Sequence, residues 1–136
     1  MRWSSHNKTV AILEFKNTKV LNKDGFKKAE CNDEKDIAIK IGRAKTALKP
    51  TLLEGNAVTV SKQVTKYSSV CKDVALFDWN SMMIYNFHGF DENASPPKPA
   101  RGTFFDEQNP ENRETFRLVL LGFIVRALER NGVQVQ

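Results

Sequence analysis

The sequence has few of the residues that build disulfide frameworks and histidine-based sites. Its 136 residues include two cysteines, Cys31 and Cys71, and two histidines, His6 and His88. Two isolated cysteines match neither a zinc-binding spacing nor a disulfide framework. Two histidines leave little scope for a histidine metal site or a Ser-His catalytic arrangement. We therefore expect a reducing, intracellular compartment, with the choice between nucleus and cytoplasm left open.

Long apolar runs are also missing. The first six residues are polar and lack the apolar segment of a signal peptide. The C-terminal apolar run, residues 116–128, is interrupted by Arg117 and Arg126 and is too short to span a bilayer. We expect no membrane partner.

Basic residues, in contrast, are frequent and unevenly distributed. Apolar residues make up 40% of the chain and charged residues 27%, as in a folded domain with one core. Residues 1–72 carry 15 Lys and Arg against 7 Asp and Glu, whereas residues 73–136 carry 6 against 9. A basic half favours a polyanionic partner, above all nucleic acid, although solvated lysine-rich faces are also common in ordinary domains.

One apolar stretch near the N-terminus ends in a carboxylate and an ammonium group. Residues 10–16 are an apolar run of strand-forming residues and predict a buried strand that ends with Glu14 and Lys16. Alternate side chains of a strand share a face, so these two groups point the same way. The acid can bind a divalent cation, and the amine can meet a phosphate or orient a water molecule. The alternative is an ordinary ion pair at a solvated strand end.

A helix is predicted over residues 57–72. Asn56 is a favourable N-cap, and the apolar residues behind it recur at helical spacing. Gln63 and Lys66 lie at the margin of this apolar stripe, and Lys62 lies on the same helix. A solvated helix flank is the alternative interpretation of these three polar residues.

The second half of the chain predicts a hairpin, a loop and a closing helix. Residues 74–77 and 82–87 are apolar and flank a turn. Residues 88–109 include a proline-rich stretch and predict a loop. Asn109-Pro110 predicts the start of a helix that ends near Arg130, with apolar residues broad enough for cover on more than one side.

Residues 22–55 are harder to interpret. Ile37, Ile39 and Ile41 alternate as in a strand, but the Ala, Lys and Arg residues between and after them favour a helix over residues 35–48. We interpret residues 22–55 as a basic insertion within a single domain that spans residues 1–136.

The order of these features resembles the PD-(D/E)XK, or restriction-endonuclease-like, nuclease superfamily. The residues of the individual motifs resemble its fungal members in particular. The resemblance rests on the Glu-Phe-Lys end of the first strand, the Gln-Val-Thr-Lys-Tyr segment of residues 63–67, and the strand at 74–77. It covers residues 10–87, and residues 113–128 more loosely. It implies an α/β fold: an incomplete restriction-endonuclease-like α/β/α sandwich, with a mixed sheet flanked by helices.

The resemblance also implies a chemistry, magnesium-dependent hydrolysis of nucleic-acid phosphodiesters. Glu14 would bind the metal, and Lys16 would stabilise charge on the phosphate or position the attacking water. Gln63 would complete the catalytic set from the helix. Lys62 and Lys66 would contact the nucleic-acid backbone.

The sequence departs from the superfamily in one respect. The other metal-binding acid of these nucleases lies on the strand before the Glu-x-Lys strand, yet residues 1–9 contain no Asp or Glu. The resemblance thus implies an N-terminally truncated or degenerate member with impaired activity.

The alternative is a non-catalytic module that binds nucleic acid or a protein. A second acid within about 6 Å of Glu14, from Asp73 or Asp78, would favour a metal site. The exposed edge of an incomplete sheet would also favour a homodimer.

Overall fold

The chain forms six strands and four α-helices in the computed structural model, which describes all residues except 6, 90–92, 94–99, 107–114 and 135–136. The strands are β1 (Arg2–Ser5), β2 (Lys8–Phe15), β3 (Glu30–Cys31), β4 (Asp73–Phe77), β5 (Ser81–Asn86) and β6 (Ala100–Asp106). The helices are α1 (Lys23–Lys27), α2 (Glu34–Thr46), α3 (Asn56–Thr65) and α4 (Phe116–Arg130), and a 3-10 turn, η1 (Lys66–Ser69), continues α3.

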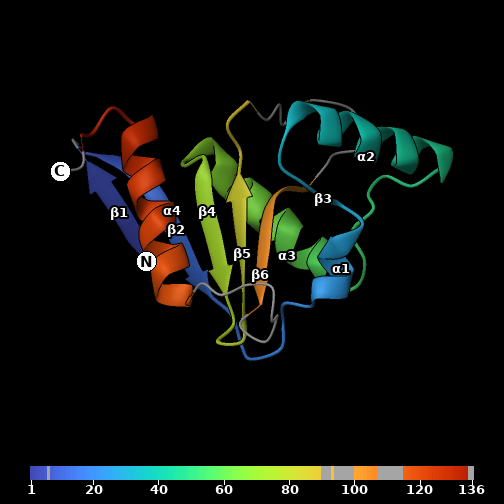
Figure 1. Cartoon of the computed structure of the whole chain (residues 1–136), viewed down its shortest axis with the longest axis horizontal. Coiled ribbons are helices and arrows are strands. Elements are labelled where there is room, and N and C mark those ends of the chain that lie inside the picture. The colour runs from blue at the N-terminus through green and yellow to red at the C-terminus, as the bar shows by residue number, and fades with distance from the viewer. Residues whose placement is uncertain (6, 90–92, 94–99, 107–114, 135–136) are drawn as a thin grey trace.

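The strands form one mixed sheet in the order β1-β2-β4-β5-β6-β3. Helix α4 lies against one face of this sheet and α3 lies behind the other (Figure 1). The predicted α/β fold, with a mixed sheet flanked by helices, is confirmed.

The centre of the sheet is the parallel pair of β2 and β4. Their register places Glu14 beside Leu76 and Phe15 beside Phe77. The backbone N–H of Lys16 donates to the carbonyl of Phe77 at 2.8 Å, so the pairing continues one residue beyond the strand. Parallel strands need a crossover connection, and the segment that contains α3 supplies it. Strand β5 then pairs antiparallel with β4, as the predicted hairpin requires.

Strand alternation divides the core between the two faces. Beneath α3, a cluster joins the sheet to the helix through buried apolar residues (Ile12, Val60, Val64, Val74, Leu76, Met83 and Tyr85). Beneath α4, a second cluster is formed by Ala11, Leu13 and Ala75 with Phe123 and Ala127 of the helix. The sheet is therefore buried on both sides at β2 and β4.

Three strands were not predicted from the sequence. No strand was predicted before residue 10, but β1 pairs antiparallel with β2. The prediction of a loop over residues 88–109 is wrong in part, because β6 pairs with β5 over five residues. Strand β3 adds a short parallel edge to β6. Strands β1 and β3 are short, and β6 contains Gly102, so their pairing partners decide their structure more than their own sequences do.

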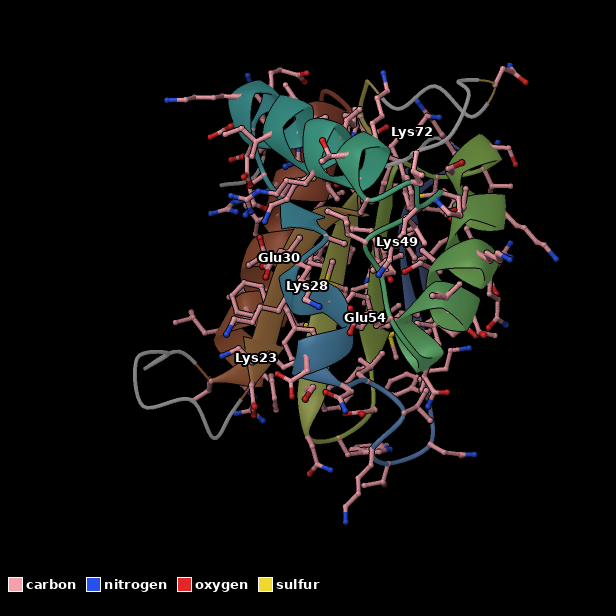
Figure 2. All side chains as sticks on the ribbon, turned by 90° about the vertical axis from the view of Figure 1, so that its right-hand side faces the viewer. Lys23, Lys28, Glu30, Lys49, Glu54 and Lys72 are labelled. Atoms are coloured by element: carbon pink, nitrogen blue, oxygen red, sulfur yellow. The ribbon has the colours of Figure 1, made fainter. Side chains whose placement is uncertain are left out.

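Part of the predicted basic insertion, residues 22–55, belongs to the core. The Phe26 ring of α1 is fully buried, with its centroid 5.4 Å from that of Phe104. On the surface of the same segment, Lys28 and Glu54 form an exposed ion pair (Figure 2). The predicted helix over residues 35–48 is observed as α2.

Two helix predictions need correction. The helix predicted over residues 57–72 is α-helical to Thr65 and continues as η1, and its N-cap is Gly55 rather than Asn56. The closing helix begins at Phe116 with Thr115 as N-cap, and the start predicted at residues 109–110 lies outside the described residues.

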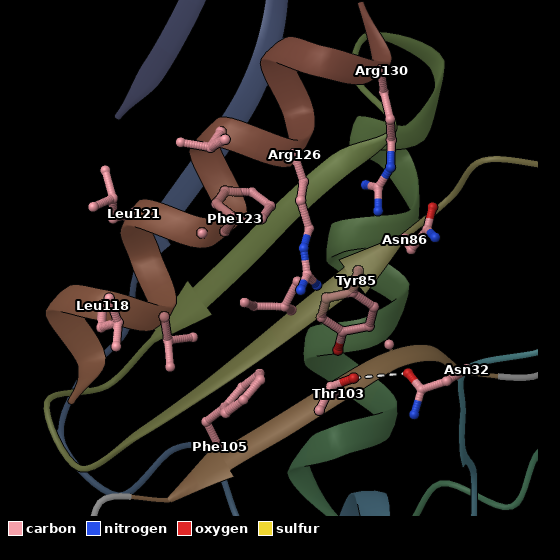
Figure 3. A pocket seen from close by; sticks show the side chains of 15 residues that line it. Asn32, Tyr85, Asn86, Thr103, Phe105, Leu118, Leu121, Phe123, Arg126 and Arg130 are labelled. Carbon is pink, nitrogen blue, oxygen red and sulfur yellow. Dashed lines mark hydrogen bonds between the residues drawn. The ribbon is translucent and has the colours of Figure 1, made fainter. Parts of the chain in front are cut away.

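Helix α4 is covered on one side, although its sequence predicted wider cover. Leu121 is 57% exposed, and Leu118 is similarly open. A groove of about 750 Å³ lies between α4 and the β5–β6 face, where Arg126 and Arg130 extend from the helix toward the sheet (Figure 3). Among the described residues, no helix has the length and apolar character of a membrane span.

Gly102 tests the pairing of β6 with β5. A Cβ at this position would lie 2.0 Å from the carbonyl oxygen of Ile84, a distance that requires the strands to move apart. We expect Gly102→Ala to lower the free energy of unfolding by at least about 2 kcal/mol in urea denaturation.

The matched control is Gly42→Ala in α2, where a Cβ would meet nothing within 4 Å. Removing a helical glycine there is expected to stabilise the protein by about 0.5–1 kcal/mol. Equal effects of the two substitutions would contradict the close approach of β5 and β6.

Candidate functional site

Three of the predicted site residues meet at the end of β2. The Lys16 Nζ atom lies 2.6 Å from Glu14 Oε1 and 2.7 Å from Gln63 Oε1. The Gln63 Nε2 atom donates to the same Glu14 oxygen at 3.3 Å. Alternation in β2 brings the two charged groups to the α3 face, and helical periodicity turns Gln63 toward them. Gln63 thus contacts the charged pair from the flank of α3, where it is exposed.

The site is partly withdrawn from water. The side chains of Lys16 and Glu14 are 15% and 21% exposed. Their charges are therefore less screened than those of a surface pair. An ammonium group has three N–H donors, and two of them are engaged by Glu14 and Gln63. The third meets no acceptor among the described residues and can bind a ligand.

One oxygen of Glu14 has no partner. The Oε2 atom is buried and accepts no hydrogen bond from the described residues. An unsatisfied buried carboxylate oxygen is unfavourable by itself, because it has lost its hydration without gaining a donor. The site is therefore poised for a ligand that brings positive charge or a donor to this atom.

Tyr67, the last residue of the Gln-Val-Thr-Lys-Tyr segment, belongs to the same site. Burial raises the pKa of Tyr67, and a side-chain hydrogen bond to Glu14, together with the negative charge of that carboxylate, raises it further. The positive charge of Arg2, on β1, acts on that pKa in the opposite direction. Arg2 was missed because β1 was not predicted, and only the pairing of β1 with β2 brings it near.

Lys62 and Lys66 are exposed, on α3 and η1 respectively. Lys66 follows Gln63 by three residues and so lies on a similar side of the helix. Both lysines therefore add positive charge to the helix that carries Gln63, without a direct contact to the Glu14–Lys16 pair.

Asp73, one candidate for the second acid, lies at the wrong end of the sheet. It begins β4, whereas Glu14 ends the parallel strand β2. Its buried carboxylate binds Nε2 of His88 at 2.8 Å and the guanidinium of Arg130. This carboxylate ties α4 to the sheet.

Asp78, the other candidate, lies at the correct end but is already engaged. Its fully buried carboxylate accepts backbone N–H groups from Leu21 (2.9 Å), Asn80 (3.1 Å) and Ser81 (2.8 Å). These bonds hold the β4–β5 turn and the loop after β2, and leave the carboxylate little capacity for a metal.

The described residues supply one carboxylate of a magnesium site but not a second. The Oε2 atom of Glu14 suits Mg²⁺, which prefers oxygen ligands. Strand β1, however, pairs Arg2 with Ile12 and adds no acid beside Glu14. No group of three or more His, Cys, Asp or Glu among the described residues could hold a metal ion. The donor set therefore does not fit the two-acid centre that the resemblance implies.

Comparisons of the chain with protein-family models, with curated proteins and with solved structures gave no match. The functional interpretation accordingly rests on the residues and geometry described above.

The titration of Tyr67 tests the site without any ligand. We expect Glu14→Gln to lower the pKa of Tyr67, because it removes a nearby negative charge, but not to the usual tyrosine value, because burial remains. The change can be followed by tyrosinate absorbance. Tyr85, whose pKa burial raises far above the usual range, serves as an internal control because it bonds Ser61 and not Glu14.

The raised pKa values of Tyr67 and Tyr85 also determine how the stability of the protein changes with pH. Both phenols bind their protons more tightly in the folded protein than in the unfolded chain. Their contribution to the free energy of unfolding is therefore complete below a pH of about 10 and is lost as the pH rises further. Glu54→Gln, remote from both tyrosines, should leave the two transitions in place. An unchanged Tyr67 transition in Glu14→Gln would contradict the assigned geometry.

Proposed function

We propose that this chain is a nuclease-like domain that binds nucleic acid, with Lys16 and Gln63 meeting a backbone phosphate at the end of β2. The observation that supports this proposal is the contact of Lys16 with both Glu14 and Gln63, which leaves one ammonium donor without an acceptor in the described part of the chain. The basic half of the chain, residues 1–72, supplies the long-range attraction.

Several features favour binding over hydrolysis by this chain alone. Phosphodiester hydrolysis of the expected kind needs a cation held firmly enough to neutralise developing charge. Glu14 offers one free oxygen for it, while Asp73 and Asp78 are bonded elsewhere. In the proposed function, Glu14 therefore positions Lys16, and Lys16 contacts the phosphate.

Magnesium-dependent cleavage is the second candidate, and the unpartnered Oε2 atom of Glu14 favours it. A Mg²⁺ ion bound there would polarise a phosphate oxygen and lower the pKa of a bound water molecule. Lys16 would orient the phosphate beside it. A second acid would then have to come from outside the residues described.

The effect of Glu14 separates the two functions. We expect wild-type protein in EDTA to bind labelled DNA or RNA with an affinity that falls steeply with salt. Lys16→Ala should weaken binding and reduce the salt slope by about one. Glu14→Gln should leave binding unchanged or tighten it, since the amide oxygen can still accept from Lys16 while the negative charge beside the phosphate is lost. Fluorescence anisotropy measures all three.

The control is Lys28→Ala, which removes a lysine from a comparable Lys–Glu pair on the exposed surface of α1. It should change binding less than Lys16→Ala does. Parallel reactions with Mg²⁺ or Mn²⁺ measure cleavage. Metal-dependent cutting that both Lys16→Ala and Glu14→Gln abolish would establish the second candidate, and no binding by wild type would refute the first.

A further inference from the structure

A cluster of aromatic rings with two exposed members lies at the same end of the sheet as the candidate site. The rings of Phe15 and Trp79 stack with centroids 5.7 Å apart, and Phe77 packs against both. Phe116 of α4 supports Phe77 from behind. Trp79 is 60% exposed and Phe15 is 46% exposed. We call Phe15, Phe77, Trp79 and Phe116 the aromatic shelf.

The backbone of the turn that carries Trp79 is strained. Trp79 has φ +74°, a region that bulky side chains rarely adopt and that glycine occupies freely. The buried carboxylate of Asp78 fixes this turn through its bonds to the N–H groups of Asn80 and Ser81. Burial of an apolar side chain could offset such backbone strain. The indole of Trp79, however, is exposed to solvent. Such an outlier points to a function for the exposed ring.

The shelf and the candidate site share the carboxyl ends of two parallel strands. Phe15, the last residue of β2, stands between Glu14 and Lys16 in the chain, and the turn that carries Trp79 follows β4 directly. The β4–β5 turn and the loop after β2 lie together in Figure 1. Since neighbouring side chains of a strand point to opposite faces, a ligand that contacts both Lys16 and the shelf must pass over these strand ends. Ligands of open α/β sheets commonly bind there.

From this juxtaposition we infer that the domain takes nucleic acid with unpaired bases, one base stacking on Trp79 and Phe15 while Lys16 holds a neighbouring phosphate. This inference rests on the proposed function and specifies its substrate class. A duplex hides its base faces in the stack, whereas a single strand offers them to aromatic side chains. The cation at the same strand ends favours this occupant over an apolar protein segment, which would offer no acceptor to the third ammonium donor of Lys16.

The test compares a labelled oligothymidylate with a duplex hairpin of equal length, in EDTA, for wild type and Trp79→Gly. Glycine removes the indole and suits the positive φ of the turn, so this variant is expected to fold. We expect Trp79→Gly to weaken single-strand binding between about 5-fold and 150-fold, the loss typical of one stacked base. Duplex binding and the salt slope should change little, and Trp79→Phe should recover much of the affinity.

Leu121→Ala is the matched control, because it removes an apolar side chain of similar exposure on α4 and should leave both affinities unchanged. Wild-type binding to both probes with no effect of Trp79→Gly would overturn the stacking inference and leave the proposed function standing. Equal losses for both probes, or a dimer of the free protein that Trp79→Gly dissociates, would show that the shelf serves the fold or self-association instead. Absence of any wild-type binding would refute both proposals.

Discussion

The parallel pairing of β2 with β4 is the constraint on which the rest of the structure depends. It sets Phe15 beside Phe77 and so brings the Glu14–Lys16 strand end level with the turn at Asp78. It requires a crossover, and that crossover places Gln63 of α3 over the charged pair. It also leaves an apolar surface on each face of the sheet, and α3 covers one of these faces and α4 the other. A change in this register by one residue would turn Glu14 and Lys16 to the opposite face.

The elements predicted from sequence were those with a strong local pattern. Strands β2, β4 and β5 are continuous apolar runs, and α2 and α3 repeat their apolar residues at helical spacing. The missed strands lack such a pattern. Residues 2–5 are mostly polar. Strand β6 contains Gly102, whose lack of a side chain allows β5 to approach closely. Phe26 was likewise not identifiable as core, since its partners Tyr85 and Phe104 lie far along the chain.

The part of the candidate site that depends on local patterns was predictable from the sequence, and the part that depends on tertiary contacts was not. Alternation placed Glu14 and Lys16 on one face, and the apolar stripe of α3 placed Gln63 at the buried margin. The positions of Asp73 and Asp78 were not predictable, because the partners of a carboxylate depend on tertiary contacts. Asp73 pairs with His88, which follows β5, and with Arg130 of α4, and Asp78 accepts N–H groups across the turn. Trp79 gave one signal in the sequence: a large aromatic residue within a turn composition.

The docking of α4 on β2 has a kinetic consequence. Ala11 and Leu13 are covered by Phe123 and Ala127, residues more than one hundred positions later in the chain. During synthesis the apolar face of β2 therefore stays open until α4 has left the ribosome. Contacts of such long separation slow folding, because a large loop must close before they form. The interval exposes an apolar strand to other chains, and a chaperone that shields β2 until the last helix docks would increase the yield of folded protein.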